Sequence, residues 1–489
     1  MSGTEAFGAA VLLAAVAGLA VLVASHLSQR IKIPLPALVL VATAVVVKVV
    51  PGLHPPAQEV VSRVVTVALV AVLFDGGMHI GLHRFRSALS PILVVGVVGT
   101  FGTAALAGVL MHLAFGLSWY ASLLVATAVA PTDPTVVFSV LGRRQVSGRS
   151  GTILEGESGA NDPVGIALMA GLLGAGRLSG AGMGHVASTF VLQMVVGAAI
   201  GLAGGRLLLW LMRRLPLPGE GLYPLRTLAA ALFLYGLATV AHGSGFLAVF
   251  TAGIVIGDER APYKREIERF HGALASLGEI VAFVTLGLTV DLHVLGRTTT
   301  WVPGLVLGLV LAVLIRPLIV GLCLLPARLP GNERLFVQFA GLKGAVPILL
   351  GGYLLGTRVP APERMYGIVV VVVIFSVVVQ GGLVGPVTGL LRLPVHIVEP
   401  EPWSLGVRLR TDPDNVHTLV VARGSRADGV EVAKLEGLPE EAWVTLLVRN
   451  GQLLAVRGDT ALRAGDRLTV LADDASADQL RETFGPQRR

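Results

Sequence analysis

The chain has 489 residues, of which 54% are hydrophobic and only 14% are charged, and its mean hydropathy is +0.77. A soluble protein of this length carries about a quarter charged residues, so the composition excludes that class. Apolar runs of about 20 residues, the length that crosses a bilayer, recur through most of the chain. The sequence therefore predicts a polytopic membrane protein.

Hydropathy, together with punctuation by glycine and proline, predicts about thirteen spans. They are expected near residues 6–26, 35–51, 60–80, 89–115, 118–140, 156–176, 185–211, 225–241, 244–258, 272–290, 300–325, 335–356 and 366–390. The first lacks the basic start of a signal peptide and is preceded by Glu5, so we expect it to be retained.

Basic residues concentrate in alternate predicted loops, for example at Arg84, Arg143, Arg213 and Arg334. By the positive-inside rule, we expect an external N-terminus and a cytoplasmic C-terminus. The net charge of +7 is then a topology signal and gives no reason to expect nucleic-acid binding.

The composition changes after Pro394, where charged residues and short alternating segments begin. Asn450-Gly451, between two β-rich runs, predicts a hairpin, and ASADQLRETFG predicts a short helix. No GxGxxG motif follows a strand, so a dinucleotide-binding unit is not expected. The sequence predicts a small cytoplasmic α+β domain.

Ionisable side chains within spans cost about 2.5–3.5 kcal/mol each, so every one needs a partner or a purpose. The candidates are Asp75 in LFDGG, Asp133 in APTDPT, Glu157 and Asp162 in GESGANDP, Glu279, Arg316 in IRP and Lys343 in GLKGAVP. Most of them fall in segments broken by glycine or proline. Irregular backbone at membrane depth is tolerated only where it lines a cavity or is buried in protein.

Two predicted spans are broken by proline, one at Pro131-Thr132-Asp133-Pro134 and the other at residues 341–347. Each is expected to form two half-helices around an extended link. Interrupted spans at corresponding positions of the two halves indicate a transport site at the bilayer midplane. Asp133 would offset the positive helix ends there, and Lys343 the negative ends.

The stretch EGESGANDP follows the first break. If it is helical, Ser158, Asn161 and Asp162 stand at i, i+3 and i+4 on one face. Their oxygens suit Na⁺ or K⁺, and the carboxylate can take up a proton instead. The alternative is a cytoplasmic loop that ends in a helix cap, with Pro163 at the start of the helix. The adjoining apolar run and the broken span favour the ion site.

Rival functions find less support. A channel would favour a repeated filter such as TVGYG, which is absent. The stretch 156–160 is one residue short of a GxSxG elbow, and neither a nucleophile–base set nor a metal cluster appears within the spans. We therefore expect a transporter, not an enzyme, with no cofactor and no metal beyond the transported ion.

Taken together, these motifs resemble monovalent cation:proton antiporter family 1. GESGANDP is similar to its ESxxND signature, and the ESG-ND-P spelling is most similar to the bacterial potassium/proton branch. APTDP, LFDGG, GSGFLAVFTAGIVIGD, FVTLGL, IRP and GLKGAVP occur in the order that the family shows, so the resemblance covers residues 5–392. Residues 403–486 resemble the TrkA C-terminal (regulator of potassium conductance) domain, notably in GDTALRAGDRLTVLAD.

The resemblance implies an all-α membrane domain at residues 1–395, with about thirteen helices in inverted repeats and two broken helices, and a regulatory α+β domain at 403–489. It implies exchange of K⁺, or also Na⁺, for H⁺ across the bacterial cytoplasmic membrane by alternating access; a Na⁺/H⁺ antiporter is the alternative. The implied partners are membrane lipid, a second copy in a homodimer, and a small ligand such as a cyclic dinucleotide at the regulatory domain.

The resemblance also implies roles for individual residues. Cation and proton would compete for Asp162, and Asn161, Ser158, Thr132 and Asp75 would complete the ion site. Asp133 and Pro134 belong to the first break. Glu157 would pair with a basic residue of the later spans, either Arg316 or Lys343. Many relatives carry arginine where this chain has Lys343, and lysine lacks the bidentate fork, so both partners stay open.

Overall fold

The computed structural model describes residues 35–49, 56–141, 144–146, 149–259, 261–357, 359–393, 395–397, 416–435, 437–439, 442–449, 452–473 and 476–485, with residue 8 and parts of 11–24. Part of the first predicted span, together with the Asn450-Gly451 turn, lies outside these residues. The chain divides into two compact units, Met1–Val398 and Glu399–Arg489, and each is described by itself.

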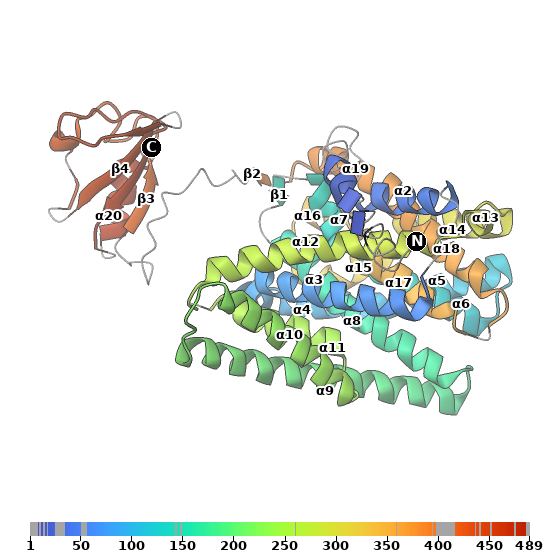
Figure 1. The fold of residues 1–489 in the computed structure, drawn as a ribbon. Helices are drawn as coiled ribbons and strands as arrows, with labels where there is room; N and C mark the ends of the chain where they lie inside the picture. Colours follow the sequence, from blue (N-terminus) through green and yellow to red (C-terminus); the bar gives the residue numbers. More distant parts are fainter. Residues whose placement is uncertain are drawn as a thin grey trace. The chain divides into compact units, whose positions relative to one another are not determined.

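The first unit is a bundle of helices (Figure 1). Its α-helices are α2 (Leu35–Val49), α3 (Gln58–Ser87), α4 (Leu89–Leu93), α5 (Thr100–Phe115), α6 (Trp119–Val129), α7 (Pro134–Leu141), α8 (Arg149–Ala175), α9 (Gly180–Arg214), α10 (Leu222–Val240), α11 (Gly245–Gly257), α12 (Lys264–Leu288), α13 (Leu292–Leu295), α14 (Thr298–Val310), α15 (Arg316–Cys323), α16 (Gly331–Phe339), α17 (Ala345–Leu354), α18 (Pro362–Phe375) and α19 (Gly381–Leu390). Three π-helical segments, η1 (Val94–Gly99), η2 (Leu311–Ile315) and η4 (Ser376–Gln380), and the 3₁₀ turn η3 (Leu325–Ala327) join some of them. The short strands β1 (Arg144–Val146) and β2 (Val395–Ile397) pair antiparallel.

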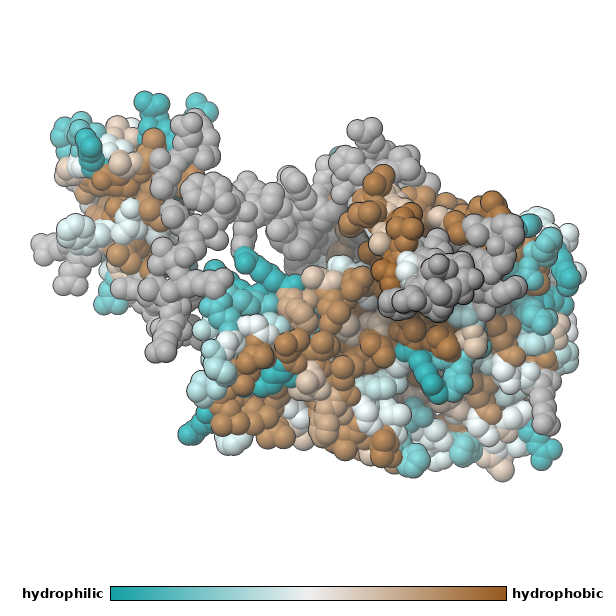
Figure 2. Space-filling model, in the orientation of Figure 1, coloured by the Kyte–Doolittle hydropathy of each residue, from teal (hydrophilic) through white to brown (hydrophobic). Residues whose placement is uncertain are grey.

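Seven helical stretches within the described residues are long and apolar enough to cross a membrane. They are Gln58–Ser87, Leu89–Phe115, Gly180–Arg214, Leu222–Val240, Lys264–Leu288, Thr298–Cys323 and Pro362–Leu390. Hydrophobic residues predominate along the middle of the face shown in Figure 2, and hydrophilic ones gather toward its ends. The structure is that of a multi-pass membrane protein, whereas the count of thirteen spans and the inverted repeats stay predictions.

Helix α11 packs so closely between α3 and α9 that only glycine fits at the contacts. A methyl group on Gly253 would come within 2.5 Å of the carbonyl oxygen of Phe74 in α3. One on Gly201 would come equally close, 2.5 Å, to the carbonyl oxygen of Ala248 in α11. Small residues let transmembrane helices approach backbone to backbone. These three helices therefore form a closely packed frame.

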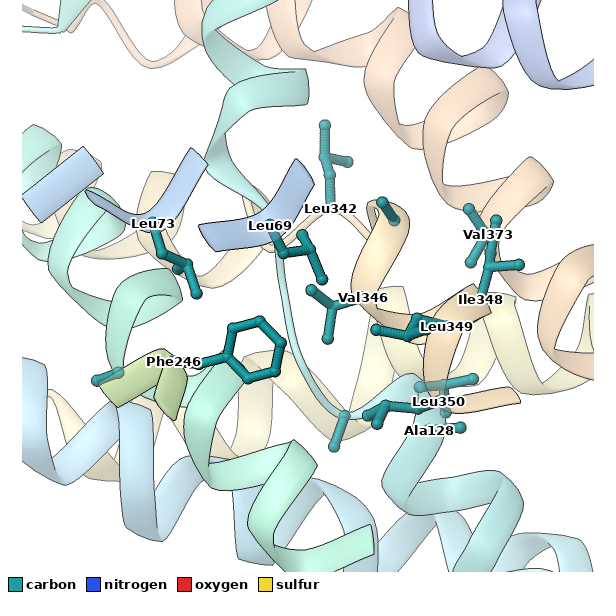
Figure 3. Packing of buried hydrophobic residues seen from close by; sticks show 14 of the residues in the cluster. Leu69, Leu73, Ala128, Phe246, Leu342, Val346, Ile348, Leu349, Leu350 and Val373 are labelled. Carbon is teal, nitrogen blue, oxygen red and sulfur yellow. The ribbon is translucent and has the colours of Figure 1, made fainter. Parts of the chain in front are cut away.

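Beside this frame, hydrophobic side chains enclose a region where two helices are interrupted. Figure 3 shows this cluster, with Leu69 and Leu73 from α3, Ala128 from α6, Phe246 from α11, Val346 to Leu350 from α17, and Val373 from α18. All of these labelled residues are buried. The polar groups of the interrupted helices are thus shielded from solvent by apolar packing, which makes any uncompensated charge among them costly.

The second unit has a four-stranded antiparallel sheet in the order β3-β6-β4-β5, with helix α20 (Ala477–Phe484). Its strands are β3 (Val416–Val420), β4 (Trp443–Arg449), β5 (Gln452–Leu454) and β6 (Arg467–Leu471), and η5 (Val432–Lys434) is a 3₁₀ turn. Arg449 pairs with Gln452 across the predicted hairpin. Leu447, Leu468 and Val470 form its core with Phe484.

One buried ion pair stabilises this sheet. The Arg449 guanidinium donates to both oxygens of Asp466, at 2.8 and 2.7 Å. Burial of Asp466 opposes its ionisation, but hydrogen bonds from Arg449 and from the Arg463 amide outweigh burial and hold the pKa of this carboxyl below its ordinary value. The pair therefore stays charged at neutral pH and ties β4 to the start of β6.

Candidate ion-binding site

Two helices are interrupted inside the bundle, and their links touch. Helix α6 ends at Val129 and α7 begins at Pro134, while α16 ends at Phe339 and α17 begins at Ala345. The backbone N–H of Asp133 donates to the carbonyl oxygen of Leu342 at 2.7 Å. Pro134 stands at the first position of α7, where its missing N–H costs least. The two links together are called the crossing below.

The stretch EGESGANDP lies inside α8, so its interpretation as a loop is wrong. The helix begins at Arg149, well before Pro163, which stands within it. Glu157, Ser158, Asn161 and Asp162 are only 2–6% exposed. The apolar surroundings and the bonds made by these side chains evidently outweigh the local tendency of Gly, Ser, Asn and Pro to form turns.

Helix α8 holds the link between α6 and α7 through three hydrogen bonds. The Asn161 side-chain amide donates to the Thr132 hydroxyl at 2.8 Å, and the Thr132 backbone N–H donates to the Asn161 side-chain oxygen at 3.3 Å. The Thr132 hydroxyl in turn donates to a Glu157 carboxylate oxygen at 3.3 Å. Thr132 and Asn161 are therefore already bonded to each other in this structure.

Of the two basic candidates, Arg316 pairs with Glu157. Its guanidinium reaches both carboxylate oxygens, at 2.7 and 3.1 Å. The same group donates to the backbone oxygens of Gln338 and Val337, each at 3.1 Å. The side chains of Arg316 and Glu157 are 7% and 3% exposed. A bidentate, nearly dry ion pair thus joins α8 to the end of α16.

Lys343 has a different role in the geometry. Its ammonium group donates to the carbonyl oxygens of Ala130 and Pro131, at 2.9 and 3.1 Å, where α6 ends. The Asp133 side chain packs against Gly344 and leaves no room there for a methyl group. Gly344 precedes the N-terminus of α17, where a carboxylate is stabilised by the helix dipole. A cation thus covers one negative helix end, and an anion lies at one positive helix end.

Asp162 differs from the other acidic residues at the crossing in that one of its buried carboxylate oxygens has no hydrogen-bond partner among the described residues. Its side chain is buried, and its Oδ1 atom has no hydrogen-bond partner in the described part of the chain. Asp133 and Lys343 lie near enough to interact with it electrostatically. A buried carboxylate oxygen without a partner is costly, and a bound cation or a proton would relieve that cost.

Asp75 lies apart from this group. Its carboxylate contacts His79, 3.3 Å away and one turn later in α3, and its Oδ1 atom is also buried without a hydrogen-bond partner. Within the described ranges, no hydrogen bond or ion pair joins Asp75 to Asp162, Asn161 or Thr132. The structure thus brings the predicted residues of α8 and the crossing together, and Asp75 does not bond to them.

Sequence analysis missed two polar residues that contact the crossing from α18 onward, Ser376 and Gln380. Both are buried; Ser376 accepts from the Lys343 amide in the link, and Gln380 donates to the Phe339 carbonyl at the end of α16. A signal was present, because they stand four residues apart in the otherwise apolar run VVVVVIFSVVVQ. Polar side chains within a span need partners, and this spacing places both on one helix face.

The geometry predicts that Glu157→Gln lowers stability more than it changes ion affinity. The substitution leaves the Arg316 charge buried without a counter-charge, which costs on the order of 3–5 kcal/mol. Thermal melting of the purified protein checks this, together with the apparent KM for the cation. The matched control is Glu59→Gln, which breaks an exposed pair with Arg63 and should leave melting unchanged. Unchanged melting of Glu157→Gln with a lost ion site would reverse the roles of Glu157 and Asp162.

Both units of the chain match known protein families. Residues 12–389 match the transmembrane sodium/hydrogen exchanger family, and residues 416–485 match the TrkA-C domain. The K(+)/H(+) antiporter NhaP of Alkalimonas amylolytica is 34% identical over 83% of this chain and 71% of its own length. The K(+)/H(+) antiporter NhaP2 of Shewanella oneidensis is 32% identical over 85% of this chain and 73% of its own length.

More distant relatives extend the match. The Na(+)/H(+) antiporter NhaH of Halobacillus dabanensis is 26% identical over 65% of this chain and 81% of its own length. The structure of the sodium proton antiporter MjNhaP1 from Methanocaldococcus jannaschii at pH 8 superimposes with a TM-score of 0.65 at 20% identity, covering 78% of this chain and 98% of that one. The last likeness shows the shared fold. The family prediction is confirmed, and the chain belongs to the sodium/hydrogen exchangers, with a TrkA-C domain after the membrane unit.

Proposed function

We propose that this protein is a secondary antiporter that exchanges a monovalent cation for H⁺ across a bacterial cytoplasmic membrane, and that it has no enzymatic activity. The observation that carries the proposal is the buried, unpartnered oxygen of Asp162 beside the crossing. Membership of the sodium/hydrogen exchanger family supports cation/proton antiport. The finer statements below concern the ion, the site and the transport cycle.

The charges at the crossing support a site for one monovalent ion. Three carboxylates, those of Asp133, Glu157 and Asp162, lie there with two basic side chains, those of Arg316 and Lys343. With all five groups ionised, one negative charge remains. One proton or one monovalent cation neutralises it, so the two ions are natural competitors for Asp162.

The carbonyl oxygens at the ends of interrupted helices can bind a cation, but several of those at the crossing already accept hydrogen bonds from basic side chains. The carbonyl oxygens of Ala130 and Pro131, at the end of α6, already accept from Lys343. Those of Val337 and Gln338, near the end of α16, accept from Arg316. We infer that side chains supply the main cation ligands, with Asp162 at the centre and Ser158, Asn161 and Thr132 as neighbours. Asp75 is proposed to act on the ion path without contacting Asp162.

The ion is proposed to be K⁺, with Na⁺ as the second candidate. The relatives at 31–34% identity are named K(+)/H(+) antiporters, and NhaH, at 26%, is named a Na(+)/H(+) antiporter. Oxygen ligands alone suit either ion. Exchange measured in everted vesicles with K⁺ and Na⁺ in parallel distinguishes the two.

A cavity at one end of the bundle supports transport by alternating access. It measures about 410 Å³ and lies among α8, α9, α10, α11 and α17, with Gln193, Tyr235, Thr239 and Phe246 among its lining residues. Ile166, one turn after Asp162 in α8, also lines it. In Figure 3, Phe246 points toward Leu69 and Val346. We propose that the cavity is one approach to Asp162 and that Phe246 and its apolar neighbours close it in this structure.

The remaining features of the proposal follow the family. We propose thirteen spans in inverted repeats, a homodimer in membrane lipid, an external N-terminus and a cytoplasmic C-terminal domain. The basic residues in alternate predicted loops support this orientation, and the stretch Pro362–Leu390 begins at the bundle end where α17 finishes and ends at the opposite side. The chain therefore leaves the membrane unit at the end away from the cavity lined by Phe246.

Asp162→Asn is expected to abolish exchange while the protein stays folded. A permanently neutral amide can neither release a proton nor balance a cation, although it fills nearly the same volume. Exchange in proteoliposomes and melting of the purified variant measure both properties. Asp291→Asn is the control, because Asp291 is exposed and caps a short helix, a task that asparagine performs equally well. Robust exchange by Asp162→Asn would remove Asp162 from the centre of the proposal.

The apparent KM for the cation is expected to rise as the pH falls. A proton occupies Asp162 more often at low pH, and where it does so most of the time the KM should rise about tenfold per pH unit. Initial exchange rates at several cation concentrations and pH values test this. A KM that stays flat over about two pH units would contradict a shared site and point to separate cation and proton sites.

The TrkA-C domain is proposed to regulate exchange by binding a small cytoplasmic ligand, with a cyclic dinucleotide as the first candidate. Regulation requires only that the ligand bind one transport state better, and a tenfold preference corresponds to about 1.4 kcal/mol. The domain has its own hydrophobic core, so removing it should not unfold the membrane unit.

Deleting the chain from Trp403 onward is therefore expected to preserve exchange and to change its dependence on pH or ligand. Trp403 itself lies outside the described residues. The full-length and truncated proteins are compared in the same vesicles over a pH series, with and without a cyclic dinucleotide. Superimposable profiles would assign the domain to assembly or stability alone.

A further inference from the structure

Arg316 donates to some, but not all, of the backbone carbonyl oxygens at the end of α16. A helix leaves its last four carbonyl groups without intrahelical partners, and in the membrane interior each needs one. The carbonyl of Phe336 accepts from the Ala340 amide at 2.7 Å, and those of Val337 and Gln338 accept from Arg316. Among the described contacts, Arg316 donates no hydrogen bond to the last carbonyl, that of Phe339.

Gln380 supplies the missing donor. Its side-chain amide donates to the Phe339 carbonyl oxygen at 2.6 Å, and its side-chain oxygen accepts from the Ser376 hydroxyl at 3.1 Å. The Ser376 oxygen accepts from the backbone N–H of Lys343 at 3.0 Å. A continuous chain of hydrogen bonds therefore runs from the end of α16, through the side chains of Gln380 and Ser376, to the backbone of Lys343.

The same link is bonded on its other side to the ion-site cluster. Leu342 accepts from the Asp133 amide, and the Lys343 ammonium group covers the end of α6. The backbone between Phe339 and Gly344 is thus bonded on one side to the first link and on the other to Ser376 and Gln380. The cavity between the link and these helices measures about 10 Å³, the lower limit for a single water. A shift of the link would have to break these bonds.

The helices that carry Ser376, Gln380 and Arg316 contain π-helical turns at or next to these residues. Ser376 and Gln380 are the first and last residues of the π-helical segment η4, and Arg316 directly follows the π-helical segment η2. Isolated π-helical turns are rare and are frequently found at functional sites. The three side chains that bond to the end of α16 and to the link thus come from two such places.

We propose that Ser376 and Gln380 are positioning residues for the ion site, which hold the α16–α17 link so that Lys343 and Asp133 stay in place around Asp162. The inference rests on the proposed antiport. It adds to the proposed ion ligands two residues, Ser376 and Gln380, that do not contact the ion and act through the α16–α17 link. Without the pair, the link keeps its bonds to the end of α6 and to Asp133, and Arg316 still holds the end of α16, but the position of Lys343 and the electrostatic balance around Asp162 become variable.

Two variants remove the pair's bonds. Ser376→Ala deletes the acceptor for the Lys343 amide, and Gln380→Leu deletes the donor for the Phe339 carbonyl. Ser376→Thr keeps the hydroxyl and serves as the conservative rescue. Thr388→Ala is the control for losing a buried hydroxyl, because Thr388 lies on the same spanning stretch and its hydroxyl donates to the Val384 carbonyl of its own helix.

Two measurements are made on the full-length protein. Hydrogen–deuterium exchange of a peptide covering residues 336–348 reports whether the link is held, independently of transport. Apparent KM and maximal rate for K⁺/H⁺ and Na⁺/H⁺ exchange in proteoliposomes report whether the ion site is affected. Ser376→Ala and Gln380→Leu should accelerate deuterium uptake in this peptide and raise the cation KM about five- to tenfold, the worth of a buried hydrogen bond. Ser376→Thr and Thr388→Ala should resemble the wild type.

The outcomes separate this inference from the proposed function. Deuterium uptake and KM that match Thr388→Ala would show that the pair does not position the link and would overturn the inference. Faster uptake with an unchanged KM would confine the pair to folding and overturn it as well. A wild-type protein that exchanges neither cation for H⁺ would overturn the proposed function, while deuterium uptake would still decide whether the two residues hold the link.

Discussion

The structure of the membrane unit depends on the need to satisfy backbone groups at two helix breaks that lie away from water. Each break frees carbonyl and amide groups that an intact helix would pair, and leaving them unpaired costs several kcal/mol each. Lys343 covers the end of α6, and Arg316 with Gln380 covers the end of α16. The basic side chains therefore donate hydrogen bonds to backbone carbonyl oxygens, and the positions of these oxygens determine where the positive charges lie.

Placing charges for this purpose has an electrostatic consequence. Arg316 needs a counter-charge once it is buried, and Glu157 supplies it bidentately. The Lys343 ammonium group, by contrast, is held by carbonyl oxygens alone among the described contacts, while Asp133 lies at the start of α17. Asp162 then remains as the carboxylate whose Oδ1 has no hydrogen-bond donor. The proposed site for an exchangeable ion thus lies where Glu157, Arg316 and Lys343 already have partners.

Much of this arrangement could be predicted from the sequence, because charge and proline within apolar runs are strong signals. Pro134 and the GLKGAVP segment marked both breaks, and GESGANDP contained the buried acids. The choice between Arg316 and Lys343 could not be predicted, since it depends on which basic group reaches two carbonyls and a carboxylate at once. The contacts of Ser376 and Gln380 with the crossing could not be predicted from hydropathy, because two uncharged polar residues hardly change the mean hydropathy of a span. The helical state of residues 155–163 was also left open, since local preference there favours a turn and only tertiary contacts overrule it.

The same contacts indicate which parts of the membrane unit can shift relative to each other. Helices α3, α9 and α11 meet through glycines, with backbone against backbone, so sliding one past another would produce steric clashes at Gly201 and Gly253. The crossing is joined by hydrogen bonds between side chains and backbone, which can break singly and reform with other partners. Phe246 is the second residue of α11 in the glycine-packed frame and belongs to the apolar cluster that includes Val346 of α17. If exchange proceeds by alternating access, we expect the change at this boundary, where the described residues of α11 and α17 meet through apolar side chains and share no backbone hydrogen bond.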